Sequence, residues 1–123
     1  MAERATFTFF QLDVWRKSVQ YAALIYEITA KFPKHEMYGI VSQLRRASVS
    51  ISSNIAEGNS RNSKTEFCRF IEIAYGSLME TVSQLCISLE QNWIDQPTFD
   101  NCTVKAEEIA RMLSGLRRSL KNK

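Results

Sequence analysis

Glycine, proline and cysteine are all scarce in this chain. Four of its 123 residues are glycine and two are proline. Because a compact all-β fold of this size needs many turns, so few turn-forming residues favour long helices instead. The three cysteines, Cys68, Cys86 and Cys102, are odd in number and widely spaced. This pattern argues against a disulfide framework and fits a reducing compartment.

Long apolar runs are missing as well. No apolar stretch approaches the roughly 18 residues that a membrane-spanning helix needs. The N-terminal segment contains Glu3 and Arg4 but no apolar region followed by a cleavage site. We therefore expect a soluble, cytoplasmic protein that makes no contact with membranes.

Histidine is represented by His35 alone, and this excludes most familiar catalytic and metal-binding patterns. A di-iron bundle needs Glu-x-x-His pairs on two helices, and a zinc site needs clustered cysteine and histidine. Neither pattern occurs in the sequence. No glycine-rich phosphate-binding loop follows a strand, because no strand is predicted. We expect no cofactor, no metal and no enzymatic activity.

The net charge of +3 comes from the C-terminal end. Four of the last seven residues are basic, and without them the chain has 12 basic and 13 acidic residues. Basic residues at the end of a helix aid solvation and complement the helix dipole. The alternative is that they contact phosphates, together with basic residues near the second predicted turn and on the last helix: Arg61, Lys64, Arg111, Arg117, Arg118, Lys121 and Lys123.

Apolar residues recur at alternating steps of three and four in four segments, which predicts four helices at residues 13–32, 36–59, 63–92 and 96–120. A chain of 123 residues fits a single domain, residues 1–123. Short connections between the helices favour an all-α, up-and-down antiparallel four-helix bundle.

Several residues predict where these helices begin and end. Residues 63–66, SKTE, form a capping box at the start of the third helix. Asp95 is the predicted N-cap of the fourth helix, with Pro97 in its first turn. Gly58 and Asn59 are expected to end the second helix in a left-handed conformation.

The first helix is apolar over more than half of its circumference. Beside its core seam it carries a second apolar stripe of Trp15, Val19, Ala22 and Tyr26. Large apolar surface is not usually left exposed, so we expect this stripe to lie between the subunits of a homo-oligomer. The alternative is a larger single core, in which the aromatic segment at residues 7–10 covers Trp15 and Tyr26.

The second helix carries a polar stripe opposite its apolar seam, formed by Arg46, Ser50, Ser53 and Glu57. Between residues 47 and 56 every side chain is that of Ala, Ser, Val, Ile or Asn, which allows close approach from more than one side. We interpret the stripe as ion pairs and hydroxyls that join subunits, with arginine supplying a planar fork. The alternatives are a cleft for a phosphate or a partner's backbone, and simple solvation.

One stretch of the second helix resembles a known family signature. Residues 43–58, QLRRASVSISSNIAEG, followed by Arg61, are similar to the signature of the 23S rRNA intervening-sequence protein family. Ser48 and Ser52 stand where the family pattern has Ala and Pro. Shorter matches extend the resemblance over about residues 10–120, at residues 12–15, 32–33, 38–39 and 70–78.

The resemblance implies a bacterial four-helix bundle that assembles as a ring-like homopentamer. A related bundle, the accessory variability protein of diversity-generating retroelements, binds nucleic acid and a reverse transcriptase. We therefore predict a non-enzymatic, homo-oligomeric scaffold or binding protein, whose partners are itself and another protein. The alternative is a protein that binds RNA or DNA with weak sequence specificity. No exposed aromatics are expected among the basic residues, so binding would be directed to the phosphate backbone.

Overall fold

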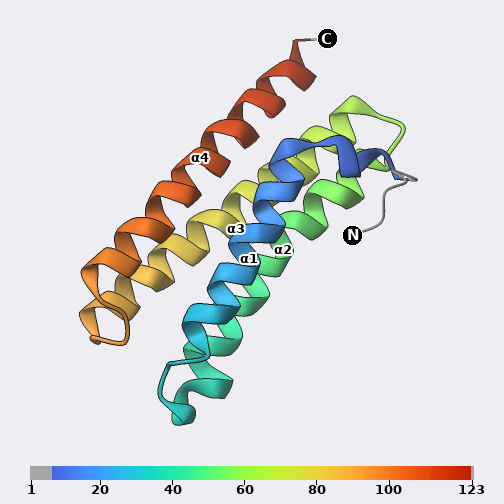
Figure 1. Ribbon diagram of the computed structural model, residues 1–123. Helices are drawn as coiled ribbons and strands as arrows, with labels where there is room; N and C mark the ends of the chain where they lie inside the picture. Colours follow the sequence, from blue (N-terminus) through green and yellow to red (C-terminus); the bar gives the residue numbers. More distant parts are fainter. Residues whose placement is uncertain (1–6, 123) are drawn as a thin grey trace.

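Four long helices make up most of the computed structural model, which describes residues 7–122 (Figure 1). They are α1 (Asp13–Thr29), α2 (Ser42–Asn59), α3 (Lys64–Glu90) and α4 (Gln96–Lys121). A 3-10 turn, η1 (Thr8–Gln11), precedes α1. Consecutive helices run antiparallel, with α2 packed between α1 and α3, and α4 packed on α3 and α1. The predicted all-α, up-and-down four-helix bundle is confirmed.

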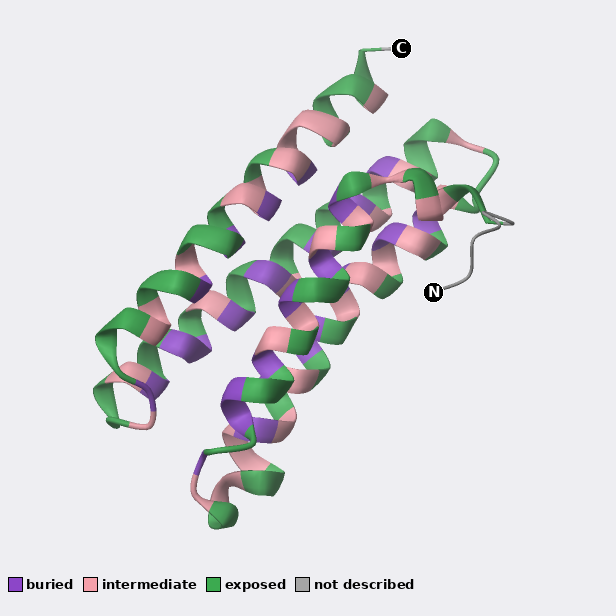
Figure 2. Ribbon diagram, in the orientation of Figure 1, coloured by how far each residue is buried: buried purple, intermediate pink, exposed green. Residues whose placement is uncertain are grey.

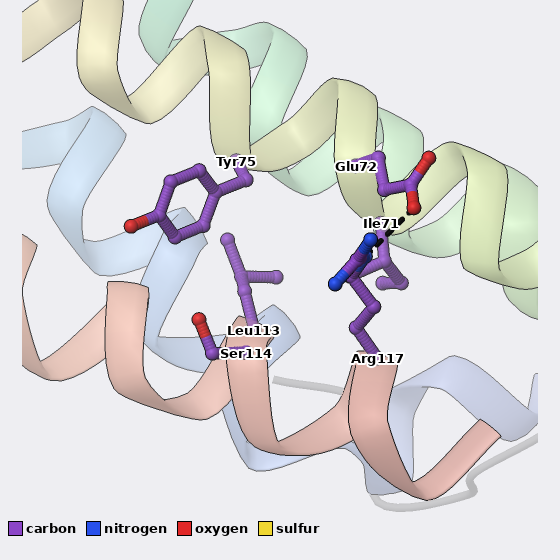
Figure 3. A pocket seen from close by; sticks show the side chains of 6 residues that line it. All are labelled: Ile71, Glu72, Tyr75, Leu113, Ser114 and Arg117. Atoms are coloured by element: carbon purple, nitrogen blue, oxygen red, sulfur yellow. Dashed lines mark hydrogen bonds and ion pairs between the residues drawn. The ribbon is translucent and has the colours of Figure 1, made fainter. Parts of the chain in front are cut away.

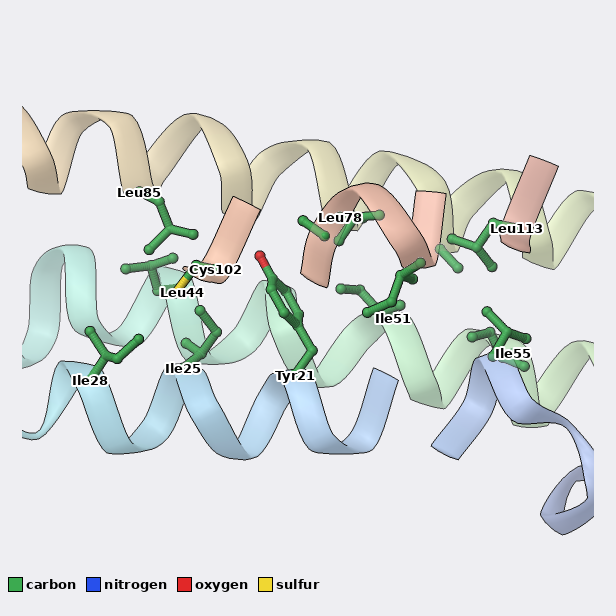
Figure 4. Packing of buried hydrophobic residues seen from close by; sticks show 14 of the residues in the cluster. Tyr21, Ile25, Ile28, Leu44, Ile51, Ile55, Leu78, Leu85, Cys102 and Leu113 are labelled. Atoms are coloured by element: carbon green, nitrogen blue, oxygen red, sulfur yellow. The ribbon is translucent and has the colours of Figure 1, made fainter. Parts of the chain in front are cut away.

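The core runs along the bundle axis and draws on all four helices (Figure 4). Figure 2 shows the buried positions as an inward stripe along the helices. Full burial of one large apolar side chain contributes about 1.5–3 kcal/mol, so these seams hold the bundle together. Its largest fully buried apolar side chains lie on the faces that the apolar spacing predicts to point inward, and they include Ile25, Leu44, Ile51, Ile55, Ile71, Leu78, Leu85, Ile109 and Leu113.

Two hydroxyl groups meet inside this core. The hydroxyl oxygens of Tyr21 in α1 and Thr81 in α3 are 2.8 Å apart. Thr81 donates its own proton to the carbonyl oxygen of Leu78 at 2.6 Å, so Tyr21 is the donor to Thr81. Burial raises the pKa of Tyr21 to about 12 and that of the Cys102 thiol to about 11. Both groups are therefore protonated at neutral pH.

Two predicted helix starts are confirmed in detail. The Oγ atom of Ser63 accepts a hydrogen bond from the backbone N–H of Glu66 at 3.1 Å. Oδ1 of Asp95 accepts one from the backbone N–H of Thr98 at 2.9 Å, and hydrogen bonding from Thr98 lowers the pKa of Asp95. Pro97 lies in the first turn of α4, where its missing N–H leaves no helical hydrogen bond unmade.

The connection between α1 and α2 differs from the prediction. α1 ends at Thr29 and not at residue 32. α2 begins at Ser42, and it is preceded by a 3-10 turn, η2 (Lys34–Glu36), and a π-helical turn, η3 (Met37–Val41). The physical reason is Gly39, whose ψ of −114° is not helical and interrupts the helix that was expected from residue 36.

Gly58 has a different role from the predicted one. α2 continues through Gly58 and Asn59, and the residue that follows, Ser60, is also in the right-handed helical region. The prediction of a left-handed turn is therefore wrong. A Cβ atom on Gly58 would lie 2.6 Å from Cβ of Phe70 and 2.9 Å from Cδ1 of Phe67. The glycine is needed because α3 approaches α2 closely at this point.

Candidate interaction surfaces

The predicted stripe on α1 divides between two environments. Trp15 is half-buried, and its ring centroid lies 4.9 Å from that of Phe9 and 5.4 Å from that of Phe10. The N-terminal aromatic segment thus covers Trp15, as the larger-core alternative expects. Val19 and Tyr26 remain exposed, Tyr26 to 45 %. Of this stripe, the part that contains Val19 and Tyr26 therefore forms an outward surface, and Trp15 does not contribute to it.

Arg45 of α2 holds Tyr26 in place. Its guanidinium carbon lies 4.6 Å from the centroid of the Tyr26 ring, and its Nε donates a hydrogen bond to Oγ1 of Thr29 at 2.9 Å. A guanidinium over an aromatic face is attracted by the ring electrons. The outer edges of α1 and α2 therefore meet along this contact.

The predicted polar stripe on α2 does face outward. Its exposed members are Arg46, Ser53 and Glu57. Ser50 is half-buried, because its hydroxyl oxygen lies 2.9 Å from that of Ser77 in α3. This hydrogen bond joins the outer edges of α2 and α3, so the two helices present one continuous surface.

The charged members of this stripe have partners other than each other. Glu57 pairs with Arg61 at 3.4 Å, one turn further along the chain. Arg46 donates from a guanidinium nitrogen to the Oγ atom of Ser42 at 3.5 Å, which is long for a hydrogen bond. No ion-pair stripe forms within the described subunit, so pairing between subunits stays a prediction.

α3 extends the same surface with apolar and small residues. Ile73 lies one turn from Ser77 and is 47 % exposed. A Cβ atom on Gly76 would meet nothing within 4 Å, so the surface is open there. The sequence predicts contacts between subunits on this side of the bundle, and we therefore call the outward surface of α1, α2 and α3 the self-association face. It comprises Val19, Ala22, Tyr26, Arg46, Val49, Ser53, Ile73 and Gly76.

A second surface, the α3–α4 groove, lies between the last two helices. Its wider part, a hollow of about 500 Å³, is lined by Lys64, Thr65, Cys68, Arg69, Glu72, Leu120 and Lys121. Its narrower part, of about 210 Å³, is lined by Ile71, Glu72, Tyr75, Leu113, Ser114 and Arg117 (Figure 3). Glu72 lines both hollows, so the two adjoin at this residue, and the α3–α4 groove comprises both of them.

Glu72 is the acidic residue among the groove's lining side chains. Nε of Arg117 donates a hydrogen bond to Oε2 of Glu72 at 2.7 Å, and Nζ of Lys121 lies 4.0 Å from the same oxygen. The hydrogen bond from Arg117, with the charges of Arg117, Lys121 and Arg69, lowers the pKa of Glu72. Glu72 in turn raises the pKa of Arg117. With Lys64, the lining holds four basic side chains against one carboxylate.

The groove gathers part of the predicted basic footprint. Lys64, Arg117 and Lys121 all line it, although they come from opposite ends of two different helices. Arg111 and Arg118 are exposed on α4 but do not line either hollow. Three of the seven basic residues that were predicted to contact phosphates therefore lie together in the groove.

Two other residues of the predicted footprint do not contribute to the groove. Arg61 lies at the turn between α2 and α3, where its guanidinium carbon is 4.9 Å from the ring centroid of Phe70. Its ion pair with Glu57 directs it toward α2. Lys123 lies outside the described residues.

Tyr75 was missed by the sequence reasoning. It is 38 % exposed, and Figure 3 shows its ring beside Leu113 and Ser114 in the narrower part of the groove. The expectation that no exposed aromatic accompanies the basic residues is therefore wrong. A signal was present in the spacing: Tyr75 follows Lys64 by 11 residues, or about three helical turns, so both lie on one side of α3.

The described residues offer no obvious metal site. Within residues 7–122, no group of three or more His, Cys, Asp or Glu side chains is arranged to hold a metal ion. None of the described helices combines the length and apolar character required to cross a membrane. The self-association face offers apolar contacts, and the α3–α4 groove offers contacts with cationic side chains.

Comparison with known proteins identifies the family of this chain and supports its fold. The family model described as 23S rRNA-intervening sequence protein matches residues 10–115. The chain belongs to this family. The structure of this chain is similar to that of a protein with unknown function from the S23 ribosomal protein family of Bacteroides thetaiotaomicron. It has a TM-score of 0.76 and 22 % sequence identity, over 85 % of this chain and 97 % of that chain, so it supports the bundle fold. Comparison with curated proteins gives no match.

Proposed function

We propose that this family member is a non-enzymatic, homo-oligomeric scaffold or binding protein whose subunits meet through the self-association face. The observation that carries the proposal is the exposure of Tyr26, Val49 and Ile73 on three neighbouring helices. Single exposed apolar residues are ordinary, but apolar residues gathered on one face mark interaction sites. A cytoplasmic setting suits the three free cysteines, since a reducing compartment keeps thiols unpaired.

The shape of the face suits the ring-like homopentamer that the family resemblance implies. A closed ring needs two different patches on each subunit, because neighbours meet head to tail. The self-association face has two unlike edges: an aromatic and aliphatic edge on α1 with Val19 and Tyr26, and an open aliphatic edge on α3 with Ile73 and Gly76. The small side chains of α2 between these edges allow two subunits to approach closely.

Light scattering coupled to gel filtration at micromolar concentration tests this proposal. We expect a mass of about five times the 14.2 kDa of one subunit. A mass of one subunit would overturn the proposal and leave the exposed apolar residues as isolated surface positions.

The groove supports a second candidate function, which is binding of RNA or DNA through the phosphate backbone. The specific observation is that Lys64, Arg117 and Lys121 converge on one groove. Each copy in an oligomer adds another groove, and several weak sites acting together bind far more tightly than one. Titration with RNA and duplex DNA at two salt concentrations tests this function. The logarithm of the affinity for a polyanion falls linearly with the logarithm of the salt concentration, and the slope is proportional to the number of phosphates contacted.

A further inference from the structure

The narrower part of the α3–α4 groove has an unusual lining for a purely electrostatic site. Tyr75 of α3 and Arg117 of α4 stand at its two ends (Figure 3). The hollow is also lined by Ile71 and Leu113, whose side chains belong to the buried core, and Figure 3 shows Leu113 between Tyr75 and Arg117. A tyrosine ring and an arginine guanidinium are both flat surfaces on which nucleobases stack. An apolar floor with a flat group at either end therefore suits a planar ring better than a phosphate.

The wider part of the groove has the complementary chemistry. It is lined by Lys64, Arg69 and Lys121, and it adjoins the narrower part at Glu72. Three cationic side chains beside a slot for a flat ring match the alternation of phosphate and base along a nucleic acid strand. An acidic peptide would satisfy the cations, but it would fill the slot between Tyr75 and Arg117 only where an aromatic side chain fell at the matching position, whereas every nucleotide carries a flat ring beside its phosphate.

We propose that the α3–α4 groove binds single-stranded nucleic acid, with one base between Tyr75 and Arg117 and the neighbouring phosphates on Lys64, Arg69 and Lys121. The inference rests on the proposed nucleic-acid binding and names its substrate class. In a duplex the faces of the bases are covered by their neighbours, whereas a single strand can present a free face. Stacking does not distinguish base edges, so RNA and DNA strands of mixed sequence both bind.

Fluorescence anisotropy on the whole 123-residue chain tests this inference. The probes are a fluorescein-labelled single-stranded RNA of mixed sequence, the DNA strand of the same sequence, and the same RNA annealed to its complement. Both single strands should bind more tightly than the duplex. Tyr75→Ala should weaken single-strand binding by about 5- to 150-fold, the usual loss for one stacked base, and Tyr75→Phe should retain it.

Tyr38→Ala is the matched control, because Tyr38 is 96 % exposed and lies outside the groove, in the connection between α1 and α2. Thermal melts of each variant establish that it is folded. Equal binding of single strand and duplex, with no effect of Tyr75→Ala, would overturn the single-strand inference but leave backbone binding in place. Binding of polyglutamate with no binding of any nucleic acid would overturn both and identify an acidic protein partner instead.

Discussion

Arg117 and Glu72 form an ion pair within the α3–α4 groove, with Nε of Arg117 2.7 Å from Oε2 of Glu72. The hydrogen bond from Arg117 lowers the pKa of Glu72 from a value that is already acidic, so this carboxylate is ionised at neutral pH. It therefore competes with a bound phosphate for the nearby Lys121 and with a stacked base for Arg117. The groove should bind a polyanion less tightly than its four basic side chains alone would allow.

Removing the charge of Glu72 should strengthen binding. Glu72→Gln frees Lys121 for a phosphate and the guanidinium of Arg117 for a stacked base, so we expect higher affinity for single-stranded RNA and a salt slope that is steeper by about 0.7, the value for one added contact. The pair is exposed, so its loss should change stability little. Glu90→Gln removes the same charge from the far end of α3 and should leave binding unchanged. Weaker binding by Glu72→Gln would show that the carboxylate positions Arg117 and does not compete for it.

The self-association face can be tested by placing a charge on it. Ile73→Glu puts a carboxylate on the open edge of α3, where burial between subunits would be costly. We expect the variant to elute as smaller species with unchanged helical content by circular dichroism. Val104→Glu is the matched control, since Val104 is 64 % exposed on α4 and lies outside the face. Assembly that survives Ile73→Glu would place the interface elsewhere.

The space around two glycines, Gly58 in α2 and Gly115 in α4, predicts the sign of their substitution by alanine. Gly58→Ala should lower the free energy of unfolding by about 1–3 kcal/mol, because its Cβ would overlap Phe70. Gly115→Ala should raise it by about 0.5–1 kcal/mol, because nothing lies closer than 3.9 Å to the added Cβ and alanine favours the helix. Chemical denaturation of both variants measures the difference. A stabilising Gly58→Ala would mean that the helices have room to separate.

Alkaline pH should weaken the fold through Tyr21. Its pKa is about 12 in the folded protein, against 10.0 for a free tyrosine. The stability that this shift supplies is fully present below pH 10.0 and is lost as the pH rises through about 12. Tyr21→Phe should remove this pH dependence and cost about 0.5–1.5 kcal/mol at neutral pH, the value of one hydrogen bond. An unchanged alkaline transition would assign the effect to other groups.

The spacing of apolar residues was sufficient to predict the four helices and their inward faces. The caps at Ser63 and Asp95 were equally predictable, because a cap depends on residues only three positions apart. The structural roles of Gly39 and Gly58 could not be predicted in this way. A glycine can serve a turn, a kink or a close contact, and the choice at Gly58 depends on Phe70, a residue of another helix.

The two surfaces differ in how far the sequence could predict them. The polar stripe of α2 and the apolar stripe of α1 each lie on one helix, so helical periodicity located them. The α3–α4 groove joins residues far apart in the chain, such as Lys64 and Lys121, and only the packing of the helices brings them together. The spacing along α3 places Tyr75 on the same side as Lys64, but only the packing of α4 places it in one hollow with Arg117.

α3 carries both surfaces on one short stretch. Glu72 and Tyr75 line the groove, while Ile73 and Gly76 belong to the self-association face. Successive helical residues are rotated by about 100°, so inserting or deleting one residue before this stretch would turn each side chain toward the wrong neighbour. The length of α3 is therefore under a stricter constraint than its composition. Relatives that keep this arrangement should differ within α3 by substitution, and should place their insertions in the connecting turns.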